Sequence, residues 1–235
     1  MKFLKQAARR SVRLIGGYEP ATLIILAIAA GGIFVFVQLA EQIIEGETHG
    51  FDERLLLLLR NPEEPKIPIG PYWVQQAMGD ITALGGTTVL TLMTVMVTIY
   101  LALARRRELA IFTLLSVLGG WILSATLKIG IARPRPDLVP HLVEVHDLSF
   151  PSGHAMLSAI VYLTLGTLLA RVQKSRATRL YMIGVAVFLT FIIGLSRIYL
   201  GVHYPTDVVG GWCAGASWAL ISFMIARRFI APTPG

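Results

Sequence analysis

Three short polar clusters interrupt a chain that is otherwise strongly apolar. They combine residue types that can bind or attack a phosphate group: lysine and arginine, a serine followed by glycine, and histidine followed by aspartate. Arginine and lysine donate strong hydrogen bonds to phosphate oxygens, and histidine can act as a nucleophile or a general acid. The clusters therefore predict phosphoryl transfer, provided that the fold brings them together. They are KIGIARPRPD (residues 128–137), PSGH (residues 151–154) and SRIYLGVHYPTD (residues 196–207).

The cations of the first and third clusters are the candidate phosphate ligands. Lys128, Arg135 and Arg197 each stand beside an apolar stretch, where an unpaired charge costs about 2.5–3.5 kcal/mol. Asp207 alone cannot neutralise them, so an external polyanion is the natural partner, and arginine forks match the oxygens of phosphate. Arg133 is expected near this site, but its role is left open.

The tetrapeptide PSGH has the composition of a helix start that binds an anion. Ser152 is a favourable N-cap residue, and Gly153 lets a ligand approach the backbone N–H groups closely. A helix N-terminus offers free donors and a partial positive charge to phosphate. Taken alone, the tetrapeptide also fits a capped helix with no other role.

The two histidines supply the reactive groups. His203 stands four residues before Asp207, so a helical turn would let the carboxylate orient one ring nitrogen while the other attacks phosphorus. His154, from a different segment, is then the candidate general acid for the leaving oxygen. Two histidines and a carboxylate could instead hold a metal ion. The neighbouring cations would repel a divalent ion, so we expect no metal and no cofactor.

The composition indicates that membrane-spanning helices position these clusters. Hydrophobic residues make up 54% of the 235 residues, charged residues make up 15%, and the mean hydropathy is +0.66. A bilayer core of about 30 Å needs roughly 20 apolar residues per helix. The sequence therefore predicts an all-α fold, an integral membrane bundle of six transmembrane helices in a single domain, residues 1–235. The predicted spans are residues 21–43, 86–104, 108–128, 153–171, 178–197 and 207–226.

The distribution of positive charge predicts the orientation of the bundle. Most of the 21 lysines and arginines fall in the N-terminal segment, in the loops at residues 105–107 and 171–179, and after the last span. Positive residues are retained on the cytoplasmic side, so we expect both termini to be cytoplasmic. All three polar clusters then lie at the opposite face of the membrane. This topology also accounts for the net charge of +7 better than nucleic-acid binding does.

The first outer loop contains one segment with helical character. The stretch FDERLLLLLR, residues 51–60, begins with acids, ends with an arginine and is followed by a proline, which is typical of a short helix. Ten residues cannot cross a bilayer. We expect an interfacial helix that either packs and anchors the bundle or guides a lipid tail toward the site, with Tyr72 and Trp73 in the aromatic belt beside it.

Together the three clusters resemble the signature of the type-2 phosphatidic acid phosphatase family, whose relatives include the vanadium haloperoxidases. The family pattern reads K-x6-R-P, P-S-G-H and S-R-x5-H-x3-D, and this chain matches it at every position. The resemblance implies a metal-independent lipid phosphatase that forms a phosphohistidine on His203, with Asp207 orienting that residue and His154 as acid and then base. The phosphate ligands that it implies are Lys128, Arg135, Ser152, Gly153 and Arg197.

A phosphate site at the outer membrane face favours an amphiphilic substrate. We expect an enzyme of the bacterial inner membrane that acts on lipid phosphates, with undecaprenyl diphosphate first and phosphatidylglycerol phosphate or phosphatidic acid as alternatives. A phospholipid-binding or transport protein without catalysis is the alternative of another class. The oligomeric state stays open, because small residues of the last span, such as Gly211 and Gly215, could pack within one chain or between two.

Overall fold

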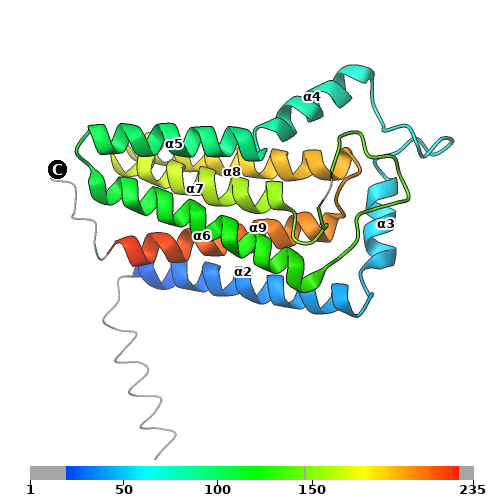
Figure 1. Cartoon of the computed structure of the whole chain (residues 1–235), viewed down its shortest axis with the longest axis horizontal. Coiled ribbons are helices and arrows are strands. Elements are labelled where there is room, and N and C mark those ends of the chain that lie inside the picture. The colour runs from blue at the N-terminus through cyan, green and yellow to red at the C-terminus, as the bar shows by residue number, and fades with distance from the viewer. Residues whose placement is uncertain (1–19, 146, 228–235) are drawn as a thin grey trace, which may run out of the picture.

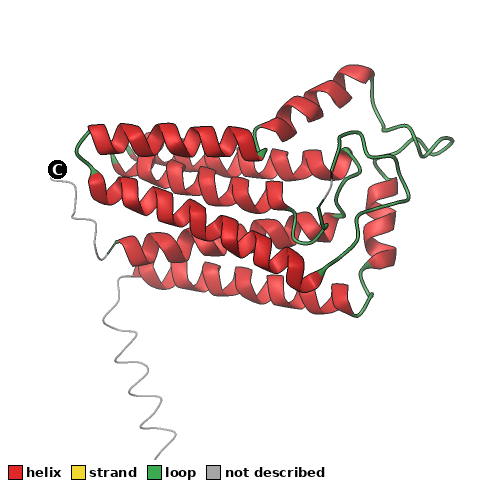
Figure 2. Ribbon diagram, viewed as in Figure 1, coloured by secondary structure: helices red, strands yellow, loops and turns green. Residues whose placement is uncertain are grey.

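A computed structural model describes residues 20–145 and 147–227, in which all regular secondary structure is α-helical. The N-terminal basic segment and the C-terminal end, which the sequence predicts to be cytoplasmic, lie outside the described residues. The long helices run side by side, and most of the loop structure gathers at one end of the bundle (Figures 1 and 2). The helices are α2 (Pro20–Ile44), α3 (His49–Leu57), α4 (Tyr72–Ala83), α5 (Thr87–Leu103), α6 (Arg107–Ile131), α7 (Gly153–Arg171), α8 (Arg176–Tyr199) and α9 (Pro205–Ala226).

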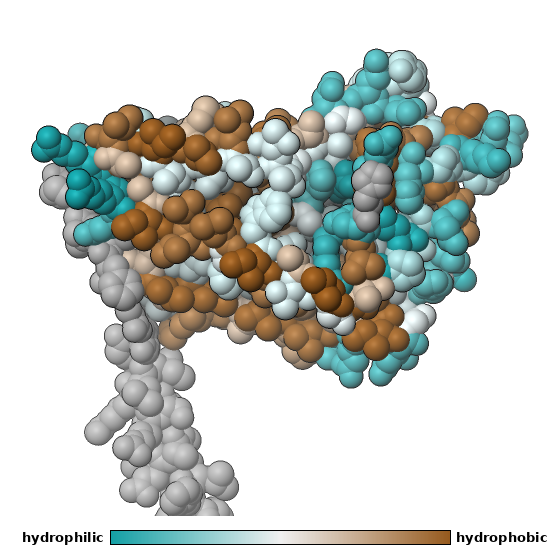
Figure 3. All heavy atoms as spheres, viewed as in Figure 1, coloured by the Kyte–Doolittle hydropathy of each residue, from teal (hydrophilic) through white to brown (hydrophobic). Residues whose placement is uncertain are grey.

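The long helices have the length and composition of membrane spans. Five of the described helices are long and apolar enough to cross a bilayer: α2, α6, α7, α8 and α9. The helix α5 has 17 residues, and it provides a sixth span when it is joined with α4 across a 43° bend. Figure 3 shows apolar residues over the middle of the bundle and hydrophilic residues at its two ends. The predicted all-α membrane bundle is confirmed, and the chain is a multi-pass membrane protein.

The first outer loop contains two helices where the sequence predicts one. The predicted helix over residues 51–60 is present as α3, shifted to residues 49–57, and it lies across the end of the bundle with Asp52 and Leu56 fully buried (Figure 1). The sequence does not predict α4, because polar residues and Gly79 interrupt its apolar pattern. Tyr72 and Trp73 begin α4 and are 71% and 67% exposed.

Gly85 lies at the bend between α4 and α5, where the chain passes very close to two other helices. A Cβ atom at this position would lie 2.4 Å from the side chain of Ile193 on α8 and 3.3 Å from the ring of His154 on α7. Only glycine lets the backbone approach so closely without displacing a neighbour. The bend therefore places the end of α4 directly beside the PSGH cluster.

The helix α7 is the centre of the bundle and packs mainly against α8 and α9. Two glycines of α9 allow the closest approach. A Cβ atom would lie 2.7 Å from the carbonyl oxygen of Ser152 at position Gly211, and 2.4 Å from that of Met156 at position Gly215. These small residues therefore pack within one chain, as small residues do at close helix crossings.

Two residues with positive φ stand where spans that carry candidate site residues end. Ala132, at φ 53°, ends α6 one turn after Lys128. Gly201, at φ 76°, lies in the short turn between α8 and α9 that carries His203. Arg60, from the first outer loop, donates from Nη1 to the carbonyl oxygen of Tyr199 at 2.9 Å and ties that loop to the turn.

Candidate active site

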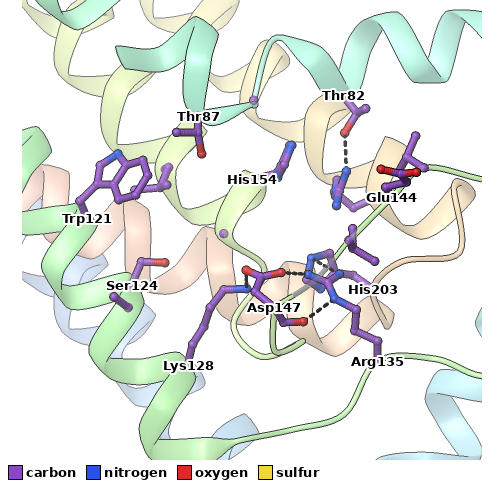
Figure 4. Close-up of a pocket in the computed structure, with 17 residues that line it drawn as sticks. Thr82, Thr87, Trp121, Ser124, Lys128, Arg135, Glu144, Asp147, His154 and His203 are labelled. Atoms are coloured by element: carbon purple, nitrogen blue, oxygen red, sulfur yellow. Dashed lines mark hydrogen bonds and ion pairs between the residues drawn. The ribbon is translucent and has the colours of Figure 1, made fainter. Parts of the chain in front are cut away.

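A cavity of about 500 Å³ lies at the end of the bundle that carries α4 and the long loop before α7 (Figure 4). Six of the eight site residues predicted from the sequence line it, although they come from α6, α7, α8 and the segments beside them. The other two, Ser152 and Asp207, are fully buried and do not line the cavity. The six lining residues are Lys128, Arg135, Gly153, His154, Arg197 and His203.

The imidazole of His203 presents one nitrogen to the cations of the cavity. Its Nε2 lies 3.1 Å from Nη1 of Arg135. A guanidinium can only donate hydrogen bonds, so Nε2 accepts this one, and we assign the proton of the neutral ring to Nδ1. The assignment leaves a lone pair on the nitrogen that faces Arg135, as a nucleophile requires.

Ser149 connects the other ring nitrogen of His203 to Asp207. Its Oγ lies 3.3 Å from Nδ1 of His203 and donates a hydrogen bond of 2.5 Å to Oδ2 of Asp207. The direct distance from Nδ1 to the same carboxylate oxygen is 3.5 Å, which is longer than an ordinary hydrogen bond. The sequence predicts a direct pair between His203 and Asp207, whereas the structure brings the two groups together with a serine hydroxyl bridging them.

The carboxylate of Asp207 has a partner on each oxygen. Its Oδ1 accepts from Arg133 at 2.6 Å, and its Oδ2 accepts from the backbone N–H of Tyr204 at 2.9 Å. Arg133 also donates to Asp52 at 2.7 Å and lies over the ring of Tyr204, 4.4 Å from its centroid. Burial disfavours the charged guanidinium, but the two carboxylates outweigh burial and raise the pKa of Arg133.

Asp147 places a carboxylate among the cations that are predicted to bind phosphate. It accepts hydrogen bonds from Nζ of Lys128 and from the guanidinium of Arg135, and its side chain is 60% exposed. Burial on its own would raise the pKa of this carboxyl, but the two cations outweigh it and lower the pKa to about 2. The group is therefore ionised at neutral pH, in a position that suits an anionic ligand.

Arg197 and His154 line another part of the cavity. Nη1 of Arg197 donates to the hydroxyl of Thr82 on α4 at 3.0 Å. Its Nε is buried and makes no hydrogen bond within the part of the chain that the structure describes, so one donor of this guanidinium is left unpaired. His154 reaches the same cavity from the first turn of α7 (Figure 4).

Burial and the neighbouring cations keep His203 neutral. Its side chain is 1% exposed, and burial is the largest reason that its pKa lies well below 6.5. Arg135, Arg197 and Lys128 lower the pKa further, because a protonated ring would add a like charge beside them. A neutral imidazole keeps the lone pair that nucleophilic attack needs.

Three residues of the site are not predicted from the sequence. Ser149 stands two residues before PSGH, and Asp147 lies in the loop between the first two clusters, so their closeness to these clusters along the chain is the one sequence signal for them. Asp52 lies in the distant first outer loop, and nothing near it in the sequence indicates its contact with Arg133. Ser152 occupies the predicted N-cap position, but its hydroxyl makes no capping bond and is buried without a partner in the described structure.

The arrangement suits in-line phosphoryl transfer. A nucleophilic nitrogen, a second histidine and several cations converge on one cavity, and the cations can neutralise the oxygens of the transferred group. Among residues 20–145 and 147–227, no group of three or more His, Cys, Asp or Glu side chains is arranged to hold a metal ion. His154, His203 and Asp207 therefore do not form the metal triad that their residue types would allow.

Residues 108–231 match the PAP2 superfamily. The chain is similar to phosphatidylglycerophosphatase B of Bacillus subtilis, with 30% identity over 216 residues, which covers 90% of this chain and 95% of that protein. An undecaprenyl-diphosphatase of Sulfolobus acidocaldarius is 34% identical over 125 residues, which covers 51% of this chain and 55% of that protein. The first likeness thus includes the outer loop and the first span as well as the three clusters.

The similarity extends to three-dimensional structure. The crystal structure of a transmembrane PAP2-type phosphatidylglycerolphosphate phosphatase from Bacillus subtilis matches with a TM-score of 0.74 at 28% identity. The match covers 85% of this chain and 96% of that one. The helical bundle therefore has a counterpart in a solved phosphatase.

Proposed function

This chain belongs to the PAP2 superfamily of lipid phosphatases, and from this premise we propose that it removes a phosphate group from a lipid through a phosphohistidine on His203, without a metal ion. The observation that carries the mechanism is the 3.1 Å contact between Nε2 of His203 and Nη1 of Arg135. A phosphate bound by Arg135 has its phosphorus within reach of that nitrogen. Lys128 and Arg197 line the same cavity and bind the remaining oxygens.

In the first half of the reaction, the lone pair on Nε2 of His203 attacks phosphorus while the bond from phosphorus to the lipid oxygen breaks. His154 donates a proton to the departing oxygen, so that the lipid leaves as an alcohol, or as a monophosphate when the substrate is a diphosphate. The proton on Nδ1 stays on the ring. Ser149 and Asp207, in contact with that side of the ring, stabilise the positive charge that the phosphorylated imidazole acquires.

In the second half, water replaces the lipid. His154, now without its proton, takes a proton from the water as its oxygen attacks phosphorus. The bond between phosphorus and Nε2 of His203 breaks, its electron pair returns to the ring, and inorganic phosphate is released. Both histidines are then in their starting protonation states.

The lining of the cavity supports a lipid substrate. It is charged around Lys128 and Arg135, whereas Trp121 and Ala125 of α6 and Leu157 of α7 extend the lining along the bundle. An amphiphile can place its phosphate among the cations and the start of its apolar part beside these side chains. Such a mixed lining suits a ligand whose polar end is bound by the charged groups while its apolar part lies beside the apolar side chains.

We propose phosphatidylglycerol phosphate as the first candidate substrate. The phosphatidylglycerophosphatase B of Bacillus subtilis matches this chain over nearly its full length. Undecaprenyl diphosphate, which the sequence reasoning puts first, is the second candidate. Its support is the likeness to an undecaprenyl-diphosphatase over about half of the chain.

We place the site at the outer face of the bacterial cytoplasmic membrane, with both termini in the cytoplasm and residues 1–235 acting as one domain. The loop between α5 and α6 carries three arginines at residues 105–107, and the loop between α7 and α8 is also basic. Both loops lie at the end of the bundle opposite to the cavity (Figure 1). Basic loops are retained on the cytoplasmic side, which supports an outward-facing site.

A phosphate-release assay on the purified full chain tests the proposal. The panel contains phosphatidylglycerol phosphate, undecaprenyl diphosphate, phosphatidic acid and the water-soluble glycerol phosphate. We expect release from at least one of the three lipids that persists in EDTA, is inhibited by vanadate, and falls by about a thousandfold or more in His203→Ala. Acid quenching with a substrate labelled in its phosphate should trap the label on the protein, and the label should be absent from His203→Ala.

The control is His49→Ala, which removes an exposed histidine of the outer loop that makes no hydrogen bond in the described structure. We expect it to release phosphate at the wild-type rate. Loss of all activity on chelation would replace this mechanism with a metal-dependent one. Full activity of His203→Ala would assign the nucleophile to another group.

A further inference from the structure

We propose that Asp52, on the outer-loop helix α3, is a positioning residue that sets the geometry and the charge of the pair formed by His203 and Asp207. The inference rests on the phosphohistidine chemistry proposed above. Asp52 does not line the cavity, and it lies outside the segment that matches the PAP2 superfamily. Its role follows from a buried network that joins α3, the segment after α6, and the first turn of α9.

Asp52 fixes the first turn of α9. Its Oδ1 accepts the backbone N–H of Thr206 at 3.0 Å, and its Oδ2 accepts the hydroxyl of Thr206 at 2.6 Å. The first N–H groups of a helix have no partner inside the helix, and a carboxylate at this end interacts favourably with the helix dipole. Here the carboxylate comes from a different helix. Because Asp207 is the next residue, the contact helps to fix the backbone from which its side chain extends.

Arg133 connects the two carboxylates. Its Nη2 donates to Asp52 at 2.7 Å, and its Nη1 donates to Oδ1 of Asp207 at 2.6 Å. Asp52 and Asp207 are fully buried, and Arg133 is 5% exposed. Charges in such surroundings are screened much less than charges in water. A change of charge at Asp52 therefore changes the electrostatic environment of Asp207 through Arg133.

The net charge of this group defines what Asp52 contributes to the reaction. Two carboxylates and one guanidinium amount to one net negative charge beside an imidazole that becomes positive when it is phosphorylated. Without the charge of Asp52 the group is neutral, and the guanidinium of Arg133 interacts with Asp207 alone. Asp207 then stabilises a positively charged His203 less well. Phosphoryl transfer slows, and the ring binds a proton less readily.

A purely structural anchor would behave differently. If Asp52 only held α3 against the bundle, its replacement would lower the thermal stability and the yield of active protein. It would not move the pH at which His203 is protonated. The charge effect and the anchoring effect are therefore distinguished by the pH dependence of the reaction.

The test is Asp52→Asn, which keeps the shape of the side chain and removes its charge. The variant is assayed for kcat and for the pH dependence of kcat/KM, with the lipid that the wild type hydrolyses fastest as the substrate. We expect kcat to fall by about tenfold and the acid limb of kcat/KM to move to lower pH by roughly half a unit or more. The matched control is Thr48→Val. Thr48 accepts from the same Nη2 of Arg133 at 3.3 Å but carries no charge, so its acid limb should stay at the wild-type position.

A second pair of variants covers the case in which Asp52→Asn does not fold. Asp52→Glu and Asp52→Gln add the same extra methylene and differ only in charge. We expect Asp52→Glu to keep the wild-type acid limb of kcat/KM and Asp52→Gln to move it to lower pH. This difference is expected even if both variants have a lower kcat than the wild type. Thermal unfolding of each purified variant in detergent reports the structural cost separately.

Three results would overturn the positioning role: a wild-type kcat and acid limb in Asp52→Asn, an equal shift in Thr48→Val, or the same acid limb in Asp52→Glu and Asp52→Gln. Failure of the proposed function is recognised separately, before any variant is compared. In that case the wild-type protein releases no phosphate from any lipid of the panel, and the positioning role falls with it.

Discussion

Nε2 of His203 and Nη1 of Arg135 are in contact, at a distance of 3.1 Å. The same guanidinium donates to the carbonyl oxygens of Val202 at 2.6 Å and Asp147 at 2.7 Å, so backbone groups on both sides hold it in place. The proposed nucleophile and one of its phosphate ligands therefore form a single rigid unit. Such preorganisation lowers the entropic cost of bringing phosphorus to the attacking atom.

The pH dependence of kcat/KM should have its acid limb below pH 6.5. His203 must be neutral to attack, and burial together with the cations around it lowers its pKa below that value. Protonation of a basic group with a lowered pKa begins only at lower pH, so activity persists at pH 6.5 and falls as the pH decreases further. Asp147, with a pKa of about 2, stays ionised above about pH 4. Its titration therefore does not affect the acid limb of kcat/KM.

Initial rates on a short-chain lipid phosphate, measured from about pH 4 to 9, check this expectation. An acid limb centred above pH 6.5 would contradict the assignment of the neutral His203 as the nucleophile of the free enzyme.

Replacement of Asp147 by asparagine should strengthen the binding of phosphate anions. The carboxylate lies on Lys128 and Arg135 and partly neutralises the two cations that are proposed to bind phosphate. Its side chain is 60% exposed, so each ion pair is partly screened by water. Exposed pairs contribute up to about 1 kcal/mol, which predicts a decrease in the inhibition constant of inorganic phosphate of up to about fivefold.

Competition experiments with inorganic phosphate on the wild type and Asp147→Asn measure this constant directly. Glu63→Gln, which removes the charge of an exposed carboxylate in the first outer loop, controls for a general effect of surface charge. Weaker inhibition of Asp147→Asn would mean that Asp147 supports the anion site instead of competing with its ligand.

Gly85→Ala should impair the proton transfer assigned to His154. The added Cβ would lie 2.4 Å from Ile193 and 3.3 Å from the ring of His154, so one of these side chains must move. Displacement of the general acid slows the departure of a poor leaving group more than that of a good one. We expect about a tenfold loss of kcat on a lipid phosphate and a smaller loss on an activated aryl phosphate.

Gly79→Ala on α4 is the matched control, because nothing lies within 4 Å of the Cβ that it adds. Alanine favours a helix over glycine by up to about 1 kcal/mol, so this variant should be as stable as the wild type or more so, with unchanged kcat. Equal losses on both substrates in Gly85→Ala would assign the effect to the substrate site as a whole.

Gly215→Ala should destabilise the bundle. Its Cβ would lie 2.4 Å from the carbonyl oxygen of Met156 and 2.8 Å from the Cβ of Ala159, so α9 must move away from α7. Overpacking of this kind costs roughly 1–3 kcal/mol. Thermal unfolding in detergent should show a lower midpoint, while Gly184→Ala, whose Cβ meets nothing within 4 Å, should not lower it. Equal midpoints for the two variants would refute a tight contact between α7 and α9.

The sequence by itself determines the membrane bundle and most of the residues around the cavity. A bilayer requires apolar runs of a set length, which is a local property, so the predicted spans and the observed helices differ by only a few residues at their ends. The three clusters stand at the ends of such runs. Six of the eight residues that they supply therefore meet at one cavity as soon as the helices are packed side by side.

The tertiary structure alone decides how these residues are held. The hydroxyl of Ser149 lies between His203 and Asp207, and Asp52 reaches Arg133 from the helix α3 in the first outer loop. Residues far apart in the chain make these contacts because the turns and glycine-mediated crossings set the packing of the helix ends. A span predicted from its apolar length specifies neither its rotation nor its neighbours, so the network behind the cavity depends on the folded bundle.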